Sequence, residues 1–236
     1  MCGHCGCDAA NHSPTHAHEH VTVDIQKNIL SFNDTCAHDN RHYFKQKNYK
    51  VFNLMSAPGS GKTTLLQQTI QALSPHYPMG VVVGDQYTEL DAQALRTQEV
   101  PSIQINTQES CHLDAHQILH AREDLHLPDG AFIFIENIGN LVCPAAFDLG
   151  ENYKIVMLSV TEGEHKPLKY APMFHHADVL IINKCDLLPY VSFSIERSME
   201  YAWQVNPKLK IFCLSCTQPD AQESGLKAWY DWLIHA

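Results

Sequence analysis

The 236-residue chain lacks several features that would place it in large classes of protein. No run of about 18 apolar residues occurs, so no transmembrane helix is expected. The N-terminus lacks the apolar core of a secretory signal, so a cytoplasmic location is expected. Basic residues number 16 against 26 acidic ones, giving a net charge of −10. With no basic excess, we expect binding neither to nucleic acid nor to an anionic membrane surface.

Two residue types are abundant instead: the chain has 9 cysteines and 16 histidines. An odd cysteine count without a secretory signal argues against a framework of disulfides. Cysteine and histidine together are the usual protein ligands of transition metals. Composition alone therefore favours a protein that handles a metal.

Composition divides the chain near residue 45. Residues 1–45 have few large apolar side chains, which predicts a mostly disordered, Cys/His-rich metal-binding tail. Within it, Val21, Ile25, Ile29 and Phe32 recur at roughly helical spacing, so a helix leading into the domain is expected there. Residues 46–236 are expected to form a single domain.

Short apolar runs alternate with amphipathic stretches from residue 49 onward. The runs cover residues 51–55, 81–83, 102–105, 131–135, 155–160, 179–182 and 211–214; the helical stretches include 63–73, 113–125 and 195–205. Nearly continuous apolar runs are typical of strands buried on both faces. Their alternation with helices predicts a mainly parallel sheet flanked by helices.

A phosphate-binding loop follows the first predicted strand, where residues 56–64 are SAPGSGKTT. Glycines let the backbone N–H groups turn toward phosphate, and the following helix adds its positive end. Lys62 is expected to reach the β- and γ-phosphates and Thr63 to ligate Mg²⁺. Ser56 stands where this motif usually has glycine. The expected phosphate-binding residues are Gly59, Ser60, Gly61, Lys62, Thr63 and Thr64. The predicted fold class is thus α/β, a P-loop NTPase.

Guanine is the expected base. Asn183, Lys184 and Asp186 follow a predicted strand, and a carboxylate there can accept hydrogen bonds from guanine N1–H and its amino group. Adenine offers no such pair, so Asp186 selects GTP over ATP in this interpretation. Ser215 and Cys216, after the last predicted strand, are expected to contact guanine O6.

Three further residues are candidates for sensing and hydrolysing the γ-phosphate. Glu136 ends a strand where a carboxylate can hold Mg²⁺ through water, and the Gly139 N–H can contact the γ-phosphate. Asp85 ends another strand and is a candidate Mg²⁺ ligand or switch residue, or else a turn or helix cap. The expected catalytic set is Lys62, Thr63, Asp85 and Glu136. No residue is assigned to positioning water, so slow turnover is expected.

Two metal sites are expected. In the tail, Cys2, Cys5 and Cys7 are separated by glycines that let several thiols meet one ion. A square-planar arrangement suits Ni²⁺ and a tetrahedral one Zn²⁺; a reduced, unliganded tail is the alternative. The histidines at 12, 16, 18 and 20 are either weak additional ligands or solvated tail residues.

The second expected site joins Cys111 and His112 to Cys143, which lies shortly after Glu136 and Gly139. A metal held there would be linked mechanically to the nucleotide state. Buried structural cysteine is the alternative. His116 and His120 share a helix face with His112 and are either ligands or surface residues. The cysteines at 36, 185, 213 and 216 are interpreted as structural.

Taken together, these motifs resemble the HypB family of GTPases that insert nickel into [NiFe]-hydrogenase. The resemblance runs from about residue 53 to the C-terminus. It rests on residues 53–64 (NLMSAPGSGKTT), 105–107 (INT), 111–116 (CHLDAH), 134–144 (FIENIGNLVCP), 159–163 (SVTEG) and 166–170 (KPLKY). The tail cysteines are similar to a high-affinity nickel motif of some members.

The resemblance implies a P-loop GTPase that dimerises upon binding GTP, with Cys111, His112 and Cys143 as a nickel/zinc site at the dimer interface. It also implies two partners, a HypA-like metallochaperone and the hydrogenase large-subunit precursor. Cys185 and Cys216 depart from the usual pattern; GTP binding is still expected, and the two thiols could add adventitious metal binding.

Three other functions stay open. A urease-accessory GTPase usually carries a Cys-Pro-His metal motif, which this chain lacks, and has no Cys-rich tail. A nickel store would bind nucleotide only structurally and show no GTP hydrolysis. An ATP-dependent kinase is disfavoured by Asp186.

Overall fold

A parallel sheet forms the centre of the fold. The computed structural model describes residues 15–85, 100–107, 110–217 and 225–236, and within them one sheet has seven strands in the order β3-β2-β4-β1-β5-β6-β7. The strands are β1 (Lys50–Ser56), β2 (Met79–Asp85), β3 (Ser102–Asn106), β4 (Phe132–Glu136), β5 (Tyr153–Ser159), β6 (Val179–Asn183) and β7 (Lys210–Cys213). Each expected apolar run is confirmed as one of these strands.

Every neighbouring pair of strands is parallel. The carboxyl ends therefore all meet at one edge of the sheet, where ligands of open α/β sheets bind. The loops that follow β1, β4, β6 and β7 all begin at that edge. The topology thus brings the predicted phosphate, γ-phosphate and base segments together.

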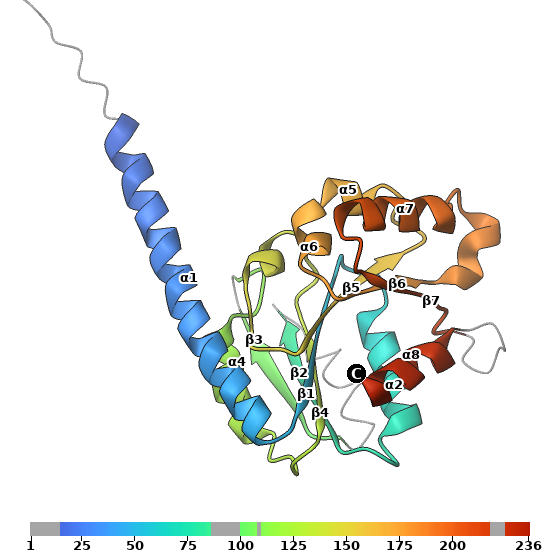
Figure 1. Cartoon of the computed structure of the whole chain (residues 1–236), viewed down its shortest axis with the longest axis horizontal. Coiled ribbons are helices and arrows are strands. Elements are labelled where there is room, and N and C mark those ends of the chain that lie inside the picture. The colour runs from blue at the N-terminus through green and yellow to red at the C-terminus, as the bar shows by residue number, and fades with distance from the viewer. Residues whose placement is uncertain (1–14, 86–99, 108–109, 218–224) are drawn as a thin grey trace, which may run out of the picture. The chain divides into compact units, whose positions relative to one another are not determined.

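Helices cover both faces, as Figure 1 shows for α2 and α8 on one side and α4 on the other. Alternate strand residues divide the core accordingly: Phe52 and Leu54 pack with α2 and α8, whereas Val51 packs with α4. The helices are α1 (Thr15–Gln46), α2 (Lys62–Leu73), α4 (Ala115–Asp124), α5 (Lys166–Lys169), α6 (Ala171–His175), α7 (Ile195–Val205) and α8 (Leu226–His235), with 3-10 turns η1 (Cys143–Ala146) and η2 (Cys185–Tyr190). The predicted α/β class is confirmed.

The helix expected around residues 21–32 is longer than its apolar spacing predicted, because α1 continues to Gln46. Within this helix the chain divides into two compact units, Met1–Phe32 and Asn33–Ala236. In the second unit, buried Asn33 and Asn40 belong to the packed face. Asn40 Nδ2 donates to the carbonyls of Ala115, at 2.8 Å, and Leu149, at 3.0 Å. These asparagines share the packed face with buried Cys36, Ala37 and Phe44 and interrupt its apolar spacing, so that spacing did not show that residues 33–45 are ordered.

Helix α8 was not predicted from the sequence. Its Trp229 is fully buried and donates a hydrogen bond from Nε1 to Thr69 Oγ1 at 3.0 Å. Across the described ranges, none of the helices has the length and apolarity that crossing a bilayer requires.

Candidate nucleotide and metal sites

The phosphate loop lies between β1 and α2 as predicted. Gly59 and Gly61 have φ angles of 75° and 101°, the left-handed region that glycine tolerates. A cavity of about 550 Å³ opens beside the loop. Its lining includes Gly59, Gly61, Lys62, Thr63, Thr64, Glu136, Gly139 and Lys184. The cavity therefore joins the phosphate loop to the segment after β4 and to the start of the base loop.

Ser56, the departure from the usual glycine, has a defined role in the loop. Its buried hydroxyl accepts hydrogen bonds from Lys62 Nζ at 2.8 Å and from Ser60 Oγ. It holds the lysine ammonium at the mouth of the loop, where a phosphate would compete for it. Nothing in the motif itself had suggested this contact.

Thr63 and Glu136 both line the cavity, and the Thr63 hydroxyl donates a hydrogen bond to Glu136 Oε1 at 2.7 Å. A hydroxyl and a carboxylate are hard oxygen donors of the kind that Mg²⁺ prefers. Glu136 ends buried β4 and is itself buried, so a divalent cation would offset the cost of its charge. The residues present therefore fit a magnesium ion.

The two predicted base-binding loops are also brought together. Asp186 accepts hydrogen bonds from Ser215 Oγ and, at 3.2 Å, from Thr217 Oγ1. Both carboxylate oxygens are therefore oriented by the loop after β7. Cys216 is buried, and its thiol donates to Asn183 Oδ1 at 3.4 Å.

The base loop is fastened to the phosphate loop. Asn183 Nδ2 donates to the Ser60 carbonyl at 2.8 Å, and Lys184 Nζ donates to the Gly59 carbonyl at 2.7 Å. A Cβ atom added to Gly61 would lie 2.5 Å from Asn183 Nδ2. Only a glycine fits at this contact between the two loops.

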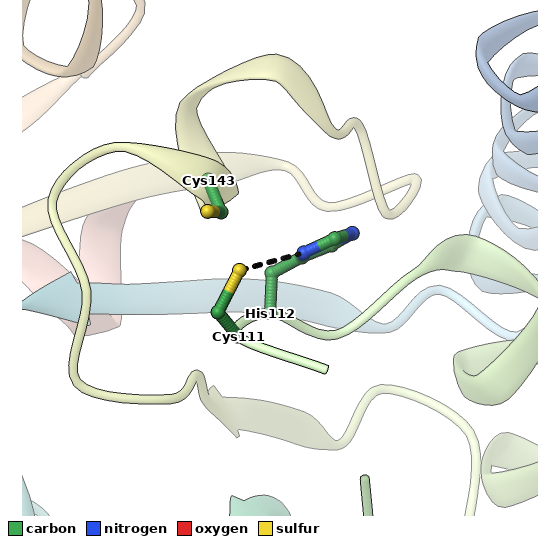
Figure 2. Close-up of side chains that lie close together, drawn as sticks. All are labelled: Cys111, His112 and Cys143. Atoms are coloured by element: carbon green, nitrogen blue, oxygen red, sulfur yellow. Dashed lines mark hydrogen bonds between the residues drawn. The ribbon is translucent and has the colours of Figure 1, made fainter. Parts of the chain in front are cut away.

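The three residues of the second predicted metal site lie close together. One ligand atom from each of Cys111, His112 and Cys143 lies within 4.8 Å of the others, and this is the sole such group of three found among the described residues. Figure 2 shows the Cys111 and Cys143 sulfurs facing each other. The Cys111 sulfur and His112 Nδ1 are 3.7 Å apart. Two thiols and an imidazole, all half-buried, suit a borderline or soft divalent ion.

These contacts affect the protonation of the candidate ligands. A hydrogen bond with Cys143 raises the pKa of the Cys111 thiol, and burial raises it further. Burial lowers the pKa of His112, so its imidazole is neutral and can bind metal at neutral pH. The His112 ring packs on Phe147 with centroids 3.9 Å apart, which limits its rotation.

One residue links the metal site to the nucleotide site, and sequence reasoning gave it no role. Asn137 follows Glu136 and is buried. Its Oδ1 accepts the N–H of Leu113 at 3.1 Å and of Ile138 at 2.9 Å. One amide oxygen thus holds both the residue after His112 and the segment that leads to Gly139. The only sequence signal was a polar side chain directly after an apolar strand.

The structure describes only some of the remaining candidate site residues. Cys2, Cys5, Cys7 and His12 lie outside the described residues, and the Asp85 side chain is likewise not described. The same holds for the side chains of the histidines at 16, 18 and 20. His116 and His120 are exposed on α4 with their Nε2 atoms 3.2 Å apart. Cys36 is buried in the packing of α1 against α4, as a structural cysteine would be.

Comparison with known proteins agrees with this geometry. A sequence model described as "CobW/HypB/UreG, nucleotide-binding domain" matches residues 50–213. The hydrogenase maturation factor HypB of Azotobacter chroococcum mcd 1 is 50% identical over 89% of this chain and 68% of its own length. The chain belongs to the HypB family.

Other HypB proteins show the same likeness. HypB of Escherichia coli K12 is 44% identical over 96% of this chain and 76% of its own length. The crystal structure of HypB from Helicobacter pylori in complex with nickel is 37% identical, with a TM-score of 0.78 over 86% of this chain and 94% of that one. These comparisons show that the chain is a member of the family of hydrogenase maturation factors and contains the family's nucleotide-binding domain.

Proposed function

We propose that this chain is a cytoplasmic, GTP-hydrolysing nickel metallochaperone for [NiFe]-hydrogenase. It binds nickel at Cys2, Cys5 and Cys7, and nickel or zinc at Cys111, His112 and Cys143. The nickel-bound HypB relative and the thiol–imidazole group support the choice of metal. We further propose that the chain dimerises with GTP and acts with a HypA-like metallochaperone on the hydrogenase large-subunit precursor.

In this proposal, hydrolysis needs positioning and electrostatic stabilisation rather than a covalent intermediate. Gly59 to Thr64 surround the phosphates, Lys62 neutralises charge on the β- and γ-phosphates, and the Gly139 N–H contacts the γ-phosphate. Thr63, Glu136 and Asp85 would hold the magnesium ion, which supplies charge neutralisation at the γ-phosphate. Asn183, Lys184, Asp186, Ser215 and Cys216 would bind guanine.

The observation that supports a metallochaperone most directly is the pair of hydrogen bonds accepted by Asn137. A γ-phosphate that draws Gly139 toward it would shift Ile138, and Asn137 would pass the shift to Leu113 and the adjacent His112. Asn140 adds a second connection, since its Oδ1 accepts the N–H groups of Val142, at 2.7 Å, and Cys143, at 3.4 Å. Both sides of the metal group would therefore move with the nucleotide segment.

The test is a nickel titration with and without a nonhydrolysable GTP analogue, on the wild type, Cys143→Ala and Asn137→Ala. Nickel affinity at the domain site should change with nucleotide by about 5-fold or more, as coupled sites usually do. Cys143→Ala should abolish this dependence and spare the tail site. Asn137→Ala should still bind each ligand alone but lose most of the coupling.

His120→Gln on the exposed face of α4 is the matched control and should leave the coupling unchanged. Circular dichroism checks that each variant is folded, since removing a buried acceptor costs about 1–3 kcal/mol. Coupling that survives both Cys143→Ala and Asn137→Ala would discard the assignment. A single-turnover assay with no GTP hydrolysis would indicate a nickel store instead.

A further inference from the structure

Two cysteines that the proposed function does not use lie beside the base-binding residues. Cys185 stands between Lys184 and Asp186 at the start of η2. Cys213 ends β7, two positions before Ser215, whose hydroxyl contacts Asp186. Both thiols are free and half-buried.

The backbone holds these two cysteines next to each other. Cys213 is in register with Ile182, the residue of β6 whose carbonyl accepts the Cys185 thiol at 3.3 Å. The Cys185 N–H donates to the Leu214 carbonyl at 3.2 Å, and the Leu214 N–H donates to the Ile182 carbonyl at 2.9 Å. Three hydrogen bonds thus fix the turn that bears Cys185 against the end of β7.

The side chains of the pair interact as well. The interaction with the Cys185 thiol lowers the pKa of the Cys213 thiol, although burial and the charge of Glu196 oppose the change. Cys213 is therefore the sulfur that more readily becomes the thiolate, the form that reacts with oxidants. Cys216, also nearby, is buried and directed to Asn183.

We propose that Cys185 and Cys213 are a redox modification site, whose reversible disulfide weakens guanine-nucleotide binding. The inference rests on the proposed function insofar as Asp186 binds guanine. Transient regulatory disulfides of this kind are the usual exception to the reduced state of cytosolic thiols.

Hydrogen peroxide is the oxidant. The Cys213 thiolate attacks one peroxide oxygen, the O–O bond breaks, and Cys213 sulfenic acid and hydroxide form. The Cys185 sulfur then attacks the Cys213 sulfur, the S–O bond breaks, and its thiol proton leaves with the oxygen as water. Two thiols have lost two electrons to peroxide, and a dithiol reductant reverses the reaction.

The expected effect on nucleotide follows from what the disulfide would move. It removes the hydrogen bond from the Cys185 thiol to Ile182 and draws the turn toward β7. Asp186 comes next in the chain, and its two oxygens are already oriented by Ser215 and Thr217. A small shift of this carboxylate misaligns both hydrogen bonds to guanine, which depend steeply on angle.

We expect fluorescent GDP to bind about tenfold more weakly after oxidation, within the usual range of coupling between sites. By reciprocity, saturating GDP should raise the midpoint potential of the pair by about 30 mV, the equivalent of tenfold for two electrons. Both effects should disappear in Cys185→Ser and Cys213→Ser.

The experiment treats the full-length chain with hydrogen peroxide, blocks remaining thiols and digests with trypsin. Mass spectrometry should find the peptide of residues 185–197 joined to that of residues 211–227, with fragment ions assigning the bond to Cys213. Cys36→Ala, which alters a buried thiol elsewhere, is the matched control and should oxidise as the wild type does. Dithiothreitol should restore GDP affinity.

The outcomes separate this inference from the proposed function. A bond through Cys216, or no bond between the two peptides, overturns the modification site. A Cys185–Cys213 bond with unchanged GDP affinity overturns its link to nucleotide. If the reduced wild type fails to bind GDP at all, the proposed function fails, while the peptide map still tests the pairing.

Discussion

At the scale of single residues, the two sites depend on polar side chains that join one segment to another. Asn137 connects β4 to the residue after His112, and Ser56 connects β1 to Lys62. Neither contact could be predicted from a periodic pattern in the sequence, because each depends on a single side chain. The candidate ligands themselves could be predicted, since metal and phosphate chemistry restricts the residue types that serve.

Asp186→Asn should change base preference. The substitution replaces an acceptor of two hydrogen bonds with an amide that can donate one, so GDP affinity should fall by about a hundredfold. Xanthosine diphosphate carries a carbonyl where guanine has its amino group, so it should gain affinity. Competition between the two nucleotides measures the change, and equal loss for both would contradict the role of Asp186.

At the scale of elements, the sequence predicted the strands well and the helices less completely. Buried parallel strands have continuous apolar runs, and each run became a strand. The second half of α1 was missed because buried Asn33 and Asn40 interrupt the apolar spacing of its packed face. For α8, the spacing of Leu226, Trp229 and Leu233 is the signal that would have found it.

Trp229 should be the main anchor of α8. Trp229→Ala removes a fully buried ring and should destabilise the fold by about 3–5 kcal/mol. Trp229→Phe keeps most of the packing but loses the hydrogen bond to Thr69, so it should cost about 1–2 kcal/mol. Urea denaturation measures both. Trp203→Ala, at a ring that is 41% exposed, is the control and should cost less than Trp229→Ala.

The pair of Arg41 on α1 and Asp148 should give a pH-dependent contribution to stability. Burial raises the pKa of Asp148, but hydrogen bonds from Arg41 and the Gly150 N–H outweigh it and hold that pKa below its usual value. The contribution is thus complete above the unfolded pKa of about 3.9 and is lost as pH falls through the folded pKa.

Asp148→Asn should therefore destabilise the chain at pH 7 by about 1 kcal/mol or less, because the pair is partly exposed and screened. The difference from wild type should shrink in acid. Urea midpoints at neutral and acidic pH test this. Asp129→Asn, at the more exposed Lys47 pair, is the control; an Asp148 effect that grows in acid would refute the sign.

At the scale of the whole molecule, the packed unit of residues 33–236 contains the complete Cys111, His112 and Cys143 group. The tail cysteines lie outside it in sequence. The proposed metal sites should therefore be separable by truncation.

Removing residues 1–14 should leave the domain folded and binding one nickel or zinc ion per chain, while the thiol-rich tail site is lost. Cys143→Ala in the full chain is the matched control and should show the opposite loss. Elemental analysis after dialysis gives the metal content, and thermal denaturation checks the fold. A truncated chain that retains no metal would refute the domain site.

The close approach of Gly61 to Asn183 has a consequence for engineering. The phosphate loop and the base loop share one packed contact with no room for even a methyl group. A designer who wishes to retarget this chain to another nucleobase cannot transplant the base loop alone. The two loops must be exchanged as a single module, because otherwise the change in base specificity will be accompanied by weaker binding of the phosphates.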